Sequence, residues 1–295
     1  MEWEGDEFME IKIEDLTKVY GSHVALDHVS LTLNEGIYGI LGENGAGKST
    51  LLNLLTDNLK KSSGNILLDG KDILKMGKDY RKMIGYMPQQ QGFYEDFSAL
   101  QFLLYIGELK GISRKQCNKQ ALKLLKMVNL YDVRHHSIRS YSGGMRQRIL
   151  LAQALLGNPD IIILDEPSVG LDPRERTHMR NIISHLGREK IVLISTHIVS
   201  DVESIASDIL LMKKGKIIKN DTPTSLIHSI KGYVKEIPID DLYYKKIKNH
   251  YKDGVFMQRS GGLQYRIVTD DKMDSQFTLD EEHINLEDVY LYYVQ

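Results

Sequence analysis

One octapeptide restricts the fold of this 295-residue chain more than any other segment. Residues 42–49 read Gly-Glu-Asn-Gly-Ala-Gly-Lys-Ser, which matches the pattern G-x-x-x-x-G-K-[ST]. Glycines let backbone N–H groups converge on an anion without interference from Cβ atoms, and the N-terminus of a following helix adds a favourable dipole. An apolar segment, 37–41, precedes the loop, and a leucine-rich one, 48–59, follows it. The sequence therefore predicts a strand, a phosphate-binding turn and a helix that bind a nucleoside triphosphate.

The residues of this loop have distinct expected roles. Lys48 reaches the β- and γ-phosphates, and the hydroxyl of Ser49 binds Mg²⁺. Thr50 offers a further hydrogen bond to phosphate. The expected nucleotide contacts of the loop are Gly42, Asn44, Gly45, Gly47, Lys48, Ser49 and Thr50.

Short apolar segments alternate with segments of helical periodicity along most of the chain. Three of them, 161–164, 191–194 and 209–212, are wholly apolar, which is typical of parallel strands buried on both faces. Helices are expected to follow the first two, at 174–187 and 200–207. This alternation predicts an α/β fold with a mainly parallel sheet.

Other segments predict two further parts of the same domain. Residues 9–16 alternate apolar and polar side chains, as a half-buried strand does, and 29–33 reads as a second strand. From about 98 to 156 the apolar residues recur at helical spacing. We therefore expect a P-loop NTPase domain at 9–230, with an antiparallel β subdomain and an inserted α-helical subdomain at about 90–156.

The two ends of the chain differ in composition from this domain. Residues 1–8 are acidic and precede the first predicted strand, so an N-terminal extension is expected there. Residues 231–295 hold eight of the 16 tyrosines, and a terminal helix is expected from Leu286. The triplet Ser260–Gly262 lies between two alternating segments, which favours a hairpin turn. We expect residues 231–295 to form a small α+β accessory domain.

Two carboxylates follow one of the buried strands. Residues 161–164 lead directly into Asp165 and Glu166. Because ligands gather at the carboxyl ends of parallel strands, both acids are expected beside the phosphate loop. Asp165 is expected to hold Mg²⁺, directly or through water, and Glu166 to polarise a water for attack on the γ-phosphate.

The composition excludes several classes of protein. With 38 Lys and Arg against 40 Asp and Glu, the chain is close to neutral, which argues against a protein that binds nucleic acid mainly through its phosphates. No apolar run approaches the roughly 20 residues of a membrane-spanning helix. The single cysteine, Cys117, permits no internal disulfide, and the acidic N-terminus does not resemble a signal peptide. We expect a soluble cytoplasmic protein.

Five further motifs occur in order between residues 9 and 230. They are Tyr20 in Thr17–Gly21, Gln89 after Tyr86-Met87-Pro88, Tyr141-Ser142-Gly143-Gly144-Met145, Ser168–Asp172, and His197 in Ser195-Thr196-His197. Together with the phosphate loop and the acidic strand end, this set resembles the ATP-binding cassette (ABC) family. Ser142 to Gly144 also precede an apolar-periodic helix, so they form a capped helix N-terminus with free backbone donors, a second anion site in one chain.

The resemblance implies a role for four of these motifs, and the fifth, Ser168–Asp172, matches the family's D-loop. Tyr20 stacks on the adenine of ATP, Gln89 senses Mg²⁺ and couples to the helical insertion, and His197 contacts the γ-phosphate. Residues 142–144 are the family's signature, and they close over the ATP held by the phosphate loop of a second subunit packed head to tail. Glu166, His197 and Gln89 are therefore the expected catalytic residues, and Ser49, Gln89 and Asp165 the expected metal-binding ones.

The resemblance also implies a function. We expect an ATP-hydrolysing subunit that pairs with a second copy or a related ATPase and powers a separate transmembrane permease on the inner face of the cell membrane. Alternatives are a soluble cassette ATPase acting on ribosomes or DNA, an importer ATPase, or a regulatory protein that closes on ATP without turnover. The chain has one set of motifs and no heptad stretch, which counts against an ATPase of ribosomes or DNA. Both acids at 165–166 are present, which counts against a regulatory protein without turnover.

The signature departs from the usual family pattern at two positions. Met145 stands where glutamine is usual, and Tyr141 where leucine is usual. Signatures of this Ser-Gly-Gly-Met form resemble those of exporters of drugs, antibiotic peptides and polysaccharides more than those of nutrient importers. Two interpretations remain for Phe93, Tyr94 and Phe97. They are either core residues or an exposed aromatic patch that receives a membrane partner.

Overall fold

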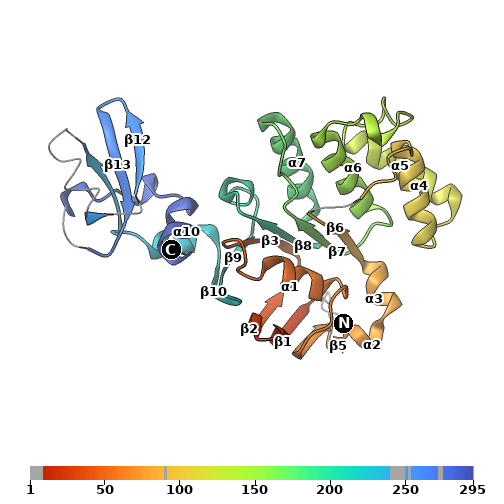
Figure 1. Ribbon diagram of the computed structural model, residues 1–295, viewed down its shortest axis with the longest axis horizontal. Helices are drawn as coiled ribbons and strands as arrows, with labels where there is room; N and C mark the ends of the chain where they lie inside the picture. The colour runs from red at the N-terminus through yellow and green to blue at the C-terminus, as the bar shows by residue number, and fades with distance from the viewer. Residues whose placement is uncertain (1–8, 90–91, 240–249, 252–253, 272–274, 295) are drawn as a thin grey trace, which may run out of the picture. The chain divides into compact units, whose positions relative to one another are not determined.

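The computed structural model describes residues 9–89, 92–239, 250–251, 254–271 and 275–294 (Figure 1). The predicted extension at 1–8 lies outside the described residues. The chain forms two compact units, and the division between them falls between Lys219 and Asn220.

The first unit is built on a six-stranded sheet with strand order β10-β9-β3-β8-β7-β6. The strands are β3 (Gly36–Leu41), β6 (Ile84–Met87), β7 (Ile161–Asp165), β8 (Ile191–Thr196), β9 (Asp208–Lys213) and β10 (Lys216–Asp221). From β9 through β3, β8 and β7 to β6, every neighbouring pair is parallel. Strands β3, β7 and β8 are buried along their whole length, so the mainly parallel sheet predicted from their apolar runs is confirmed.

A second sheet of the first unit is antiparallel and has the order β2-β1-β4-β5. Its strands are β1 (Ile11–Tyr20), β2 (His23–Leu33), β4 (Ser63–Leu68) and β5 (Lys71–Asp72). Strands β1 and β2 are longer than predicted because they stay paired as far as Tyr20 and His23, on either side of a tight turn. Their outer ends are largely exposed and therefore lack the alternation of apolar residues that marks a strand in the sequence.

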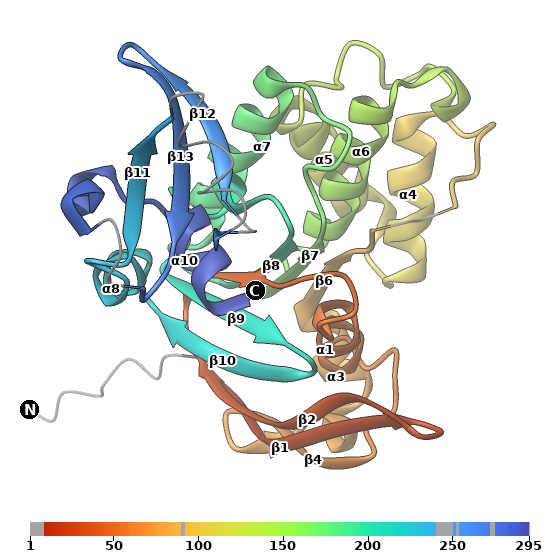
Figure 2. The same ribbon diagram turned by 60° about the vertical axis from the view of Figure 1, so that its left-hand side comes forward.

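The helices of the first unit surround the parallel sheet. They are α1 (Lys48–Leu55), α2 (Ile73–Met76), α3 (Lys78–Met83), α4 (Ala99–Leu109), α5 (Arg114–Met127), α6 (Gly143–Leu155) and α7 (Pro173–Leu186), with the 3-10 turns η1 (Ile138–Ser140) and η2 (Val199–Asp201). Figures 1 and 2 show α4, α5 and α6 together on the far side of the parallel sheet from β1 and β2. The helical insertion predicted from the change of periodicity is therefore confirmed.

Helix α1 ends at Leu55, four residues earlier than predicted. Asp57 has a positive φ of 57°, the N–H of Asn58 donates to the carbonyl of Asn53, and that of Asp57 donates to Leu54. These two bonds satisfy carbonyls that the helix end would leave unpaired, in the arrangement of a Schellman cap. A left-handed Asp in place of the usual glycine is not evident from the sequence.

The predicted helix at 200–207 is wrong. The chain forms only η2 there, followed by turns in which Val202 and Ile205 donate to carbonyls three residues earlier. Three β-branched residues at 198, 199 and 202 disfavour a helix. In addition, the side chain of Asp201 bonds to Ser168, outside the segment, and so fixes the local backbone.

No helix among the described residues is long and apolar enough to cross a bilayer.

The second unit contains a three-stranded antiparallel sheet with the order β11-β13-β12. In the described part of this unit the elements are β11 (Val234–Pro238), β12 (Val255–Arg259), β13 (Gly262–Val268), the helices α8 (Pro223–Ser229) and α10 (Leu286–Val294), and the 3-10 turns η3 (Ser275–Phe277) and η4 (Glu281–His283). The predicted hairpin turn at 260–262 and the terminal helix from Leu286 are confirmed. A domain boundary at 230 stays a prediction.

Candidate nucleotide site

A pocket of about 230 Å³ lies above the phosphate loop, in the first unit. Of the residues predicted to bind nucleotide, metal or water, it is lined by Tyr20, Asn44, Gly45, Gly47, Lys48, Ser49, Thr50, Gln89 and Glu166. These residues come from the end of β1, the β3–α1 loop, the first turn of α1, the segment after β6 and the position directly after β7. The structure thus brings together side chains that are up to 146 positions apart in the sequence. Gly42, Asp165, His197 and residues 142–144 do not line this pocket.

The turn into α1 requires glycine at position 47. Gly47 has φ of 106°, a conformation that L side chains rarely adopt, and a Cβ there would lie 2.7 Å from the carbonyl oxygen of Ala25. Gly45 also has a positive φ, of 86°, and open space around it. The loop can therefore present its N–H groups to an anion at the start of α1.

Lys48 is buried at the base of this loop, with 7% of its surface exposed. Its Nζ donates to the carbonyl oxygens of Gly42, at 2.5 Å, and Glu43, at 3.2 Å. Burial lowers the pKa of Lys48, and the charges of Glu166 and Asp165 oppose that shift. Two carbonyls thus hold the ammonium group where a phosphate would compete for it.

The carboxyl ends of the adjacent strands β7 and β8 carry the acidic residues and His197. Asp165 pairs in register with Ser195, and the Ser195 hydroxyl donates to the Asp165 carboxylate. Glu166 is only 5% exposed, and its N–H donates to the carbonyl of Ser195 at 2.9 Å. Its Oε2 lies 2.9 Å from Nδ1 of His197. Glu166, His197 and the phosphate loop therefore form one connected site, as the strand-end argument predicted.

Tyr20 lies at the other end of the pocket and is 46% exposed. The Nζ of Lys18 lies 4.8 Å from the centre of the Tyr20 ring, which is a cation–π contact. Lys18 is itself held by the carbonyl of Lys60 at 2.7 Å. One face of the ring is thus occupied by a fixed cation, which leaves the opposite face for a planar base.

The signature residues lie at the N-terminus of α6. Ser142 caps this helix, because its hydroxyl accepts from the N–H of Met145 at 3.2 Å. Gly143 has open space around it, whereas a Cβ at Gly144 would collide with the carboxylate of Glu175. Arg148 holds that carboxylate at 2.9 Å. The first turn of α6 is therefore fixed from α7 and faces open space at Gly143.

Comparisons with known proteins agree with this arrangement. A family profile described as ABC transporter matches residues 26–169. The chain is 36% identical over 250 residues to an uncharacterized ABC transporter ATP-binding protein, YxlF, of Bacillus subtilis, which covers 80% of this chain and 83% of that one. It is also 36% identical over 212 residues to the bacitracin transport ATP-binding protein BcrA of Bacillus licheniformis, covering 71% and 68%. The chain belongs to the ABC transporter family.

Solved structures of the family agree with its fold and activity. A dimeric post-hydrolysis structure of the ATP-binding cassette MJ0796, bound to ADP and Pi, superposes with a TM-score of 0.66 at 28% identity and covers 72% of this chain and 98% of that one. This ABC protein is thus an ATP-binding and ATP-hydrolysing subunit of a transporter. The alternatives outside transport are not favoured by these matches.

Sequence reasoning missed several residues of the cassette's pocket. His23, Ala25 and Glu43 also line it, and Ser195 holds Asp165 from behind. Ala25 and His23 carry no signal of their own, since strand pairing alone brings β2 to the loop. Ser195 stands two residues before His197, so its position near the end of β8 was the available clue.

Proposed function

We propose that two copies of this cassette, or one copy and a related subunit, close around two ATP molecules. The observation that carries the proposal is the position of residues 142–144, whose helix N-terminus faces open space and lines no part of the chain's own nucleotide pocket. A helix N-terminus with bare N–H groups binds anions. Its phosphate would have to come from a nucleotide bound to another subunit.

In this proposal Lys48, Glu166 and His197 have distinct tasks in hydrolysis. Lys48 and the N–H groups of residues 45–50 bind and orient the β- and γ-phosphates. Glu166 accepts a proton from the attacking water, and His197, hydrogen-bonded to Glu166, keeps that carboxylate in place and contacts the γ-phosphate. Because the γ-phosphate would be bound from both subunits, its loss on hydrolysis reopens the dimer.

The residues also fit a Mg²⁺ ion of the kind that accompanies ATP. Magnesium takes one or two protein oxygens and completes its shell with phosphate and water, and it supplies charge neutralisation to the phosphates. The described residues contain no group of three or more His, Cys, Asp or Glu that would hold a metal by themselves. Ser49 and Gln89 line the pocket, and the Asp165 carboxylate lies at the adjacent strand end, so these three residues would hold Mg²⁺ with the nucleotide.

Dimer closure can be tested with a variant that binds ATP without turnover. Glu166→Gln is expected to abolish phosphate release and to give a stable dimer by light scattering with ATP and Mg²⁺. Adding Gly143→Asp should restore the monomer, because the new carboxylate repels the partner's triphosphate. Asp is favourable at a helix N-terminus, so α6 should remain intact. A Glu166→Gln protein that stays monomeric with ATP bound, or one that keeps hydrolysing, would contradict the proposal.

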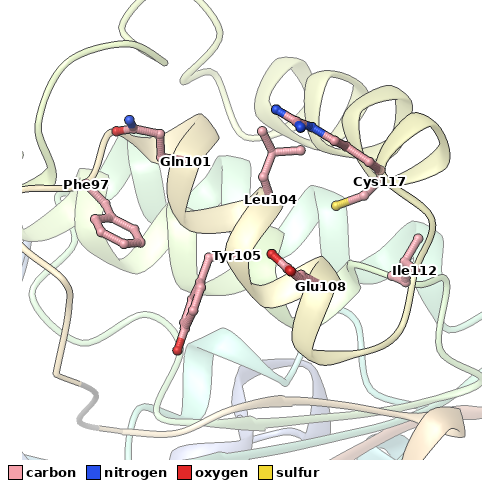
Figure 3. A pocket seen from close by; sticks show the side chains of 8 residues that line it. Phe97, Gln101, Leu104, Tyr105, Glu108, Ile112 and Cys117 are labelled. Atoms are coloured by element: carbon pink, nitrogen blue, oxygen red, sulfur yellow. The ribbon is translucent and has the colours of Figure 1, made fainter.

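The transmembrane permease is proposed to contact the groove along α4. This α4 groove has a volume of about 570 Å³ and is lined by Phe97, Gln101, Leu104, Tyr105, Glu108, Ile112, Arg114 and Cys117 (Figure 3). The ring centroids of Tyr94 and Tyr105 are 5.2 Å apart, and those of Phe97 and Tyr105 are 5.8 Å apart. Tyr94 is 51% exposed, so this aromatic cluster is only partly core.

The position of the α4 groove supports this choice of partner. Gln89 lines the nucleotide pocket, and the aromatic cluster begins five residues later in the chain, at Tyr94. A cytoplasmic helix or loop of the permease that presses on these rings would therefore act on the segment that reaches the nucleotide. The cassette would then lie in the cytoplasm, on the inner face of the membrane.

We propose export of a drug, a peptide or a related compound as the transport reaction. The Ser-Gly-Gly-Met signature and the similarity to a bacitracin transport ATP-binding protein support it. The test is co-expression with the membrane subunit and measurement of ATPase activity with and without it. Tyr94→Ala with Tyr105→Ala should remove the stimulation by the permease but keep the basal rate. Tyr131→Ala, outside the groove, is the matched control, and equal stimulation of all three proteins would exclude the groove as the contact.

A further inference from the structure

A buried carboxylate lies behind the catalytic residues and touches neither the phosphate loop nor the nucleotide pocket. Asp201, in η2, is 4% exposed. The hydroxyl of Ser168, itself 2% exposed, donates to Oδ2 of Asp201. The two residues are 33 positions apart, and each lies shortly after a member of the catalytic pair, Ser168 after Glu166 and Asp201 after His197.

The second oxygen of Asp201 has a charged neighbour but no hydrogen bond. Oδ1 lies 3.7 Å from Nε of Arg176, on α7, and neither atom has a hydrogen-bond partner in the structure. A buried carboxylate oxygen without a donor destabilises the folded state, because its desolvation is not compensated by a hydrogen bond. Such a group in a folded protein calls for an explanation. A small shift of either segment would convert this contact into a charge-assisted hydrogen bond.

Asp201 provides a side-chain link between the two segments behind the catalytic pair. Arg180 of α7 donates to the backbone of Ser200 at 3.0 Å, which holds η2 to α7. The N–H of Leu171 donates to the carbonyl of Ser168 at 3.2 Å, a bond within the loop after β7. The Ser168–Asp201 bond therefore ties this loop to η2.

We propose that Asp201 is a positioning residue for ATP hydrolysis: through Ser168 and Arg176 it fixes the loop that carries Glu166 against the segment that carries His197. This inference rests on the proposed roles of Glu166 and His197. It assigns Asp201 no contact with the nucleotide. The link thus acts on the geometry of the reacting groups and leaves ATP binding to the phosphate loop.

The test separates kcat from KM in the full-length protein. Asp201→Ala is expected to lower kcat at least about tenfold, since misplacement of reacting groups by about 1 Å can cost ~100-fold. KM for ATP should stay within about twofold, because the ground-state contacts are intact. Asp201→Asn keeps an acceptor for Ser168 and a similar shape, so it should recover most of the rate. Ser200→Ala, an exposed neighbour on η2, is the matched control and should leave both constants unchanged.

A double-mutant cycle shows whether the two residues act as one unit. Ser168→Ala should lower kcat by itself, and adding it to Asp201→Ala should cause little further loss. Ser168→Ala removes only one hydroxyl, so it also serves if Asp201→Ala does not fold. An unchanged kcat in both variants, a KM that rises as kcat falls, or independent effects in the cycle would overturn the proposal. Failure of the Glu166 role would appear separately, as continued hydrolysis by Glu166→Gln.

Discussion

The Nδ1 atom of His197 lies 2.9 Å from Oε2 of Glu166, although the His197 side chain is 56% exposed and the Glu166 side chain only 6% exposed. A carboxylate only accepts hydrogen bonds, so Nδ1 donates and fixes the ring. Nε2 then remains available for a second partner. The pair thus connects a buried acid to a group that can reach a bound phosphate.

Removal of this histidine should affect turnover far more than binding. His197→Ala is expected to lower kcat about 100-fold, the usual range for a group that positions or shares a proton in the transition state. ATP affinity should change less than about threefold, because Lys48 and the loop supply most ground-state contacts. Phosphate release and calorimetric titration measure the two effects. His185→Ala, an exposed histidine on α7, controls for loss of an imidazole, and equal rates for both variants would contradict the role.

Glu166 has a backbone conformation that favours glycine. Its φ is 52°, and a non-glycine residue in this region costs about 1–2 kcal/mol. Both Glu166→Gly and Glu166→Ala remove the carboxylate, but only glycine relieves the backbone. We expect Glu166→Gly to be more stable than Glu166→Ala by about 1 kcal/mol in urea unfolding, with both inactive. If alanine is equal or better, the positive φ carries no strain.

Lys48 makes nucleotide affinity depend on pH in a stated direction. Phosphate binding needs the ammonium form, and burial lowers the pKa of Lys48 from its ordinary value of 10.5. As pH rises toward 10.5, affinity should therefore begin to fall at a lower pH than it would for an exposed lysine. Titration in a Tyr20→Phe background excludes the phenol as the source.

Removal of the lysine provides the reference for that titration. Lys48→Ala should bind ATP at least about tenfold more weakly at neutral pH, since a charge-assisted hydrogen bond contributes about 1.5–3 kcal/mol. Its remaining affinity should not change with pH over the same range. A pH profile that is the same with and without Lys48 would assign the effect to another group.

The parts of the fold that the sequence predicts well are those with strong local signals. Strands β7 and β8 are continuous apolar runs because helices cover both faces of the parallel sheet, and the phosphate loop is one contiguous motif. The extents of β1, β2 and η2 depend instead on tertiary contacts, such as the pairing of Lys18 with Leu26 and the bond between Asp201 and Ser168. Local periodicity does not contain that information.

The residues of the site also divide into those that the sequence predicts and those that only the tertiary structure shows. Lys48, Asp165, Glu166 and their neighbours follow from spacing and from the position of strand ends, whereas the Ser168–Asp201 bond joins residues of two turns. Asp201 lies in the segment Ser200–Glu203, in which three of the four residues are polar, as is typical of a solvent-exposed helix surface. Only the tertiary structure buries its carboxylate, so composition and pattern do not single it out.

The Tyr20 ring can be tested as an adenine platform with a ligand that lacks the base. Stacking of a base on an aromatic ring contributes about 1–3 kcal/mol, so Tyr20→Ala should weaken ATP binding by roughly 5- to 100-fold. Tyr20→Phe keeps the ring and should bind normally. Inorganic triphosphate offers phosphates but no base, so its affinity should be the same for all three proteins. Tyr20 and Lys48 line the same pocket, so loss of the ring could also disturb the phosphate loop. If Tyr20→Ala loses as much affinity for triphosphate as for ATP, the ring supports the loop and does not stack on adenine.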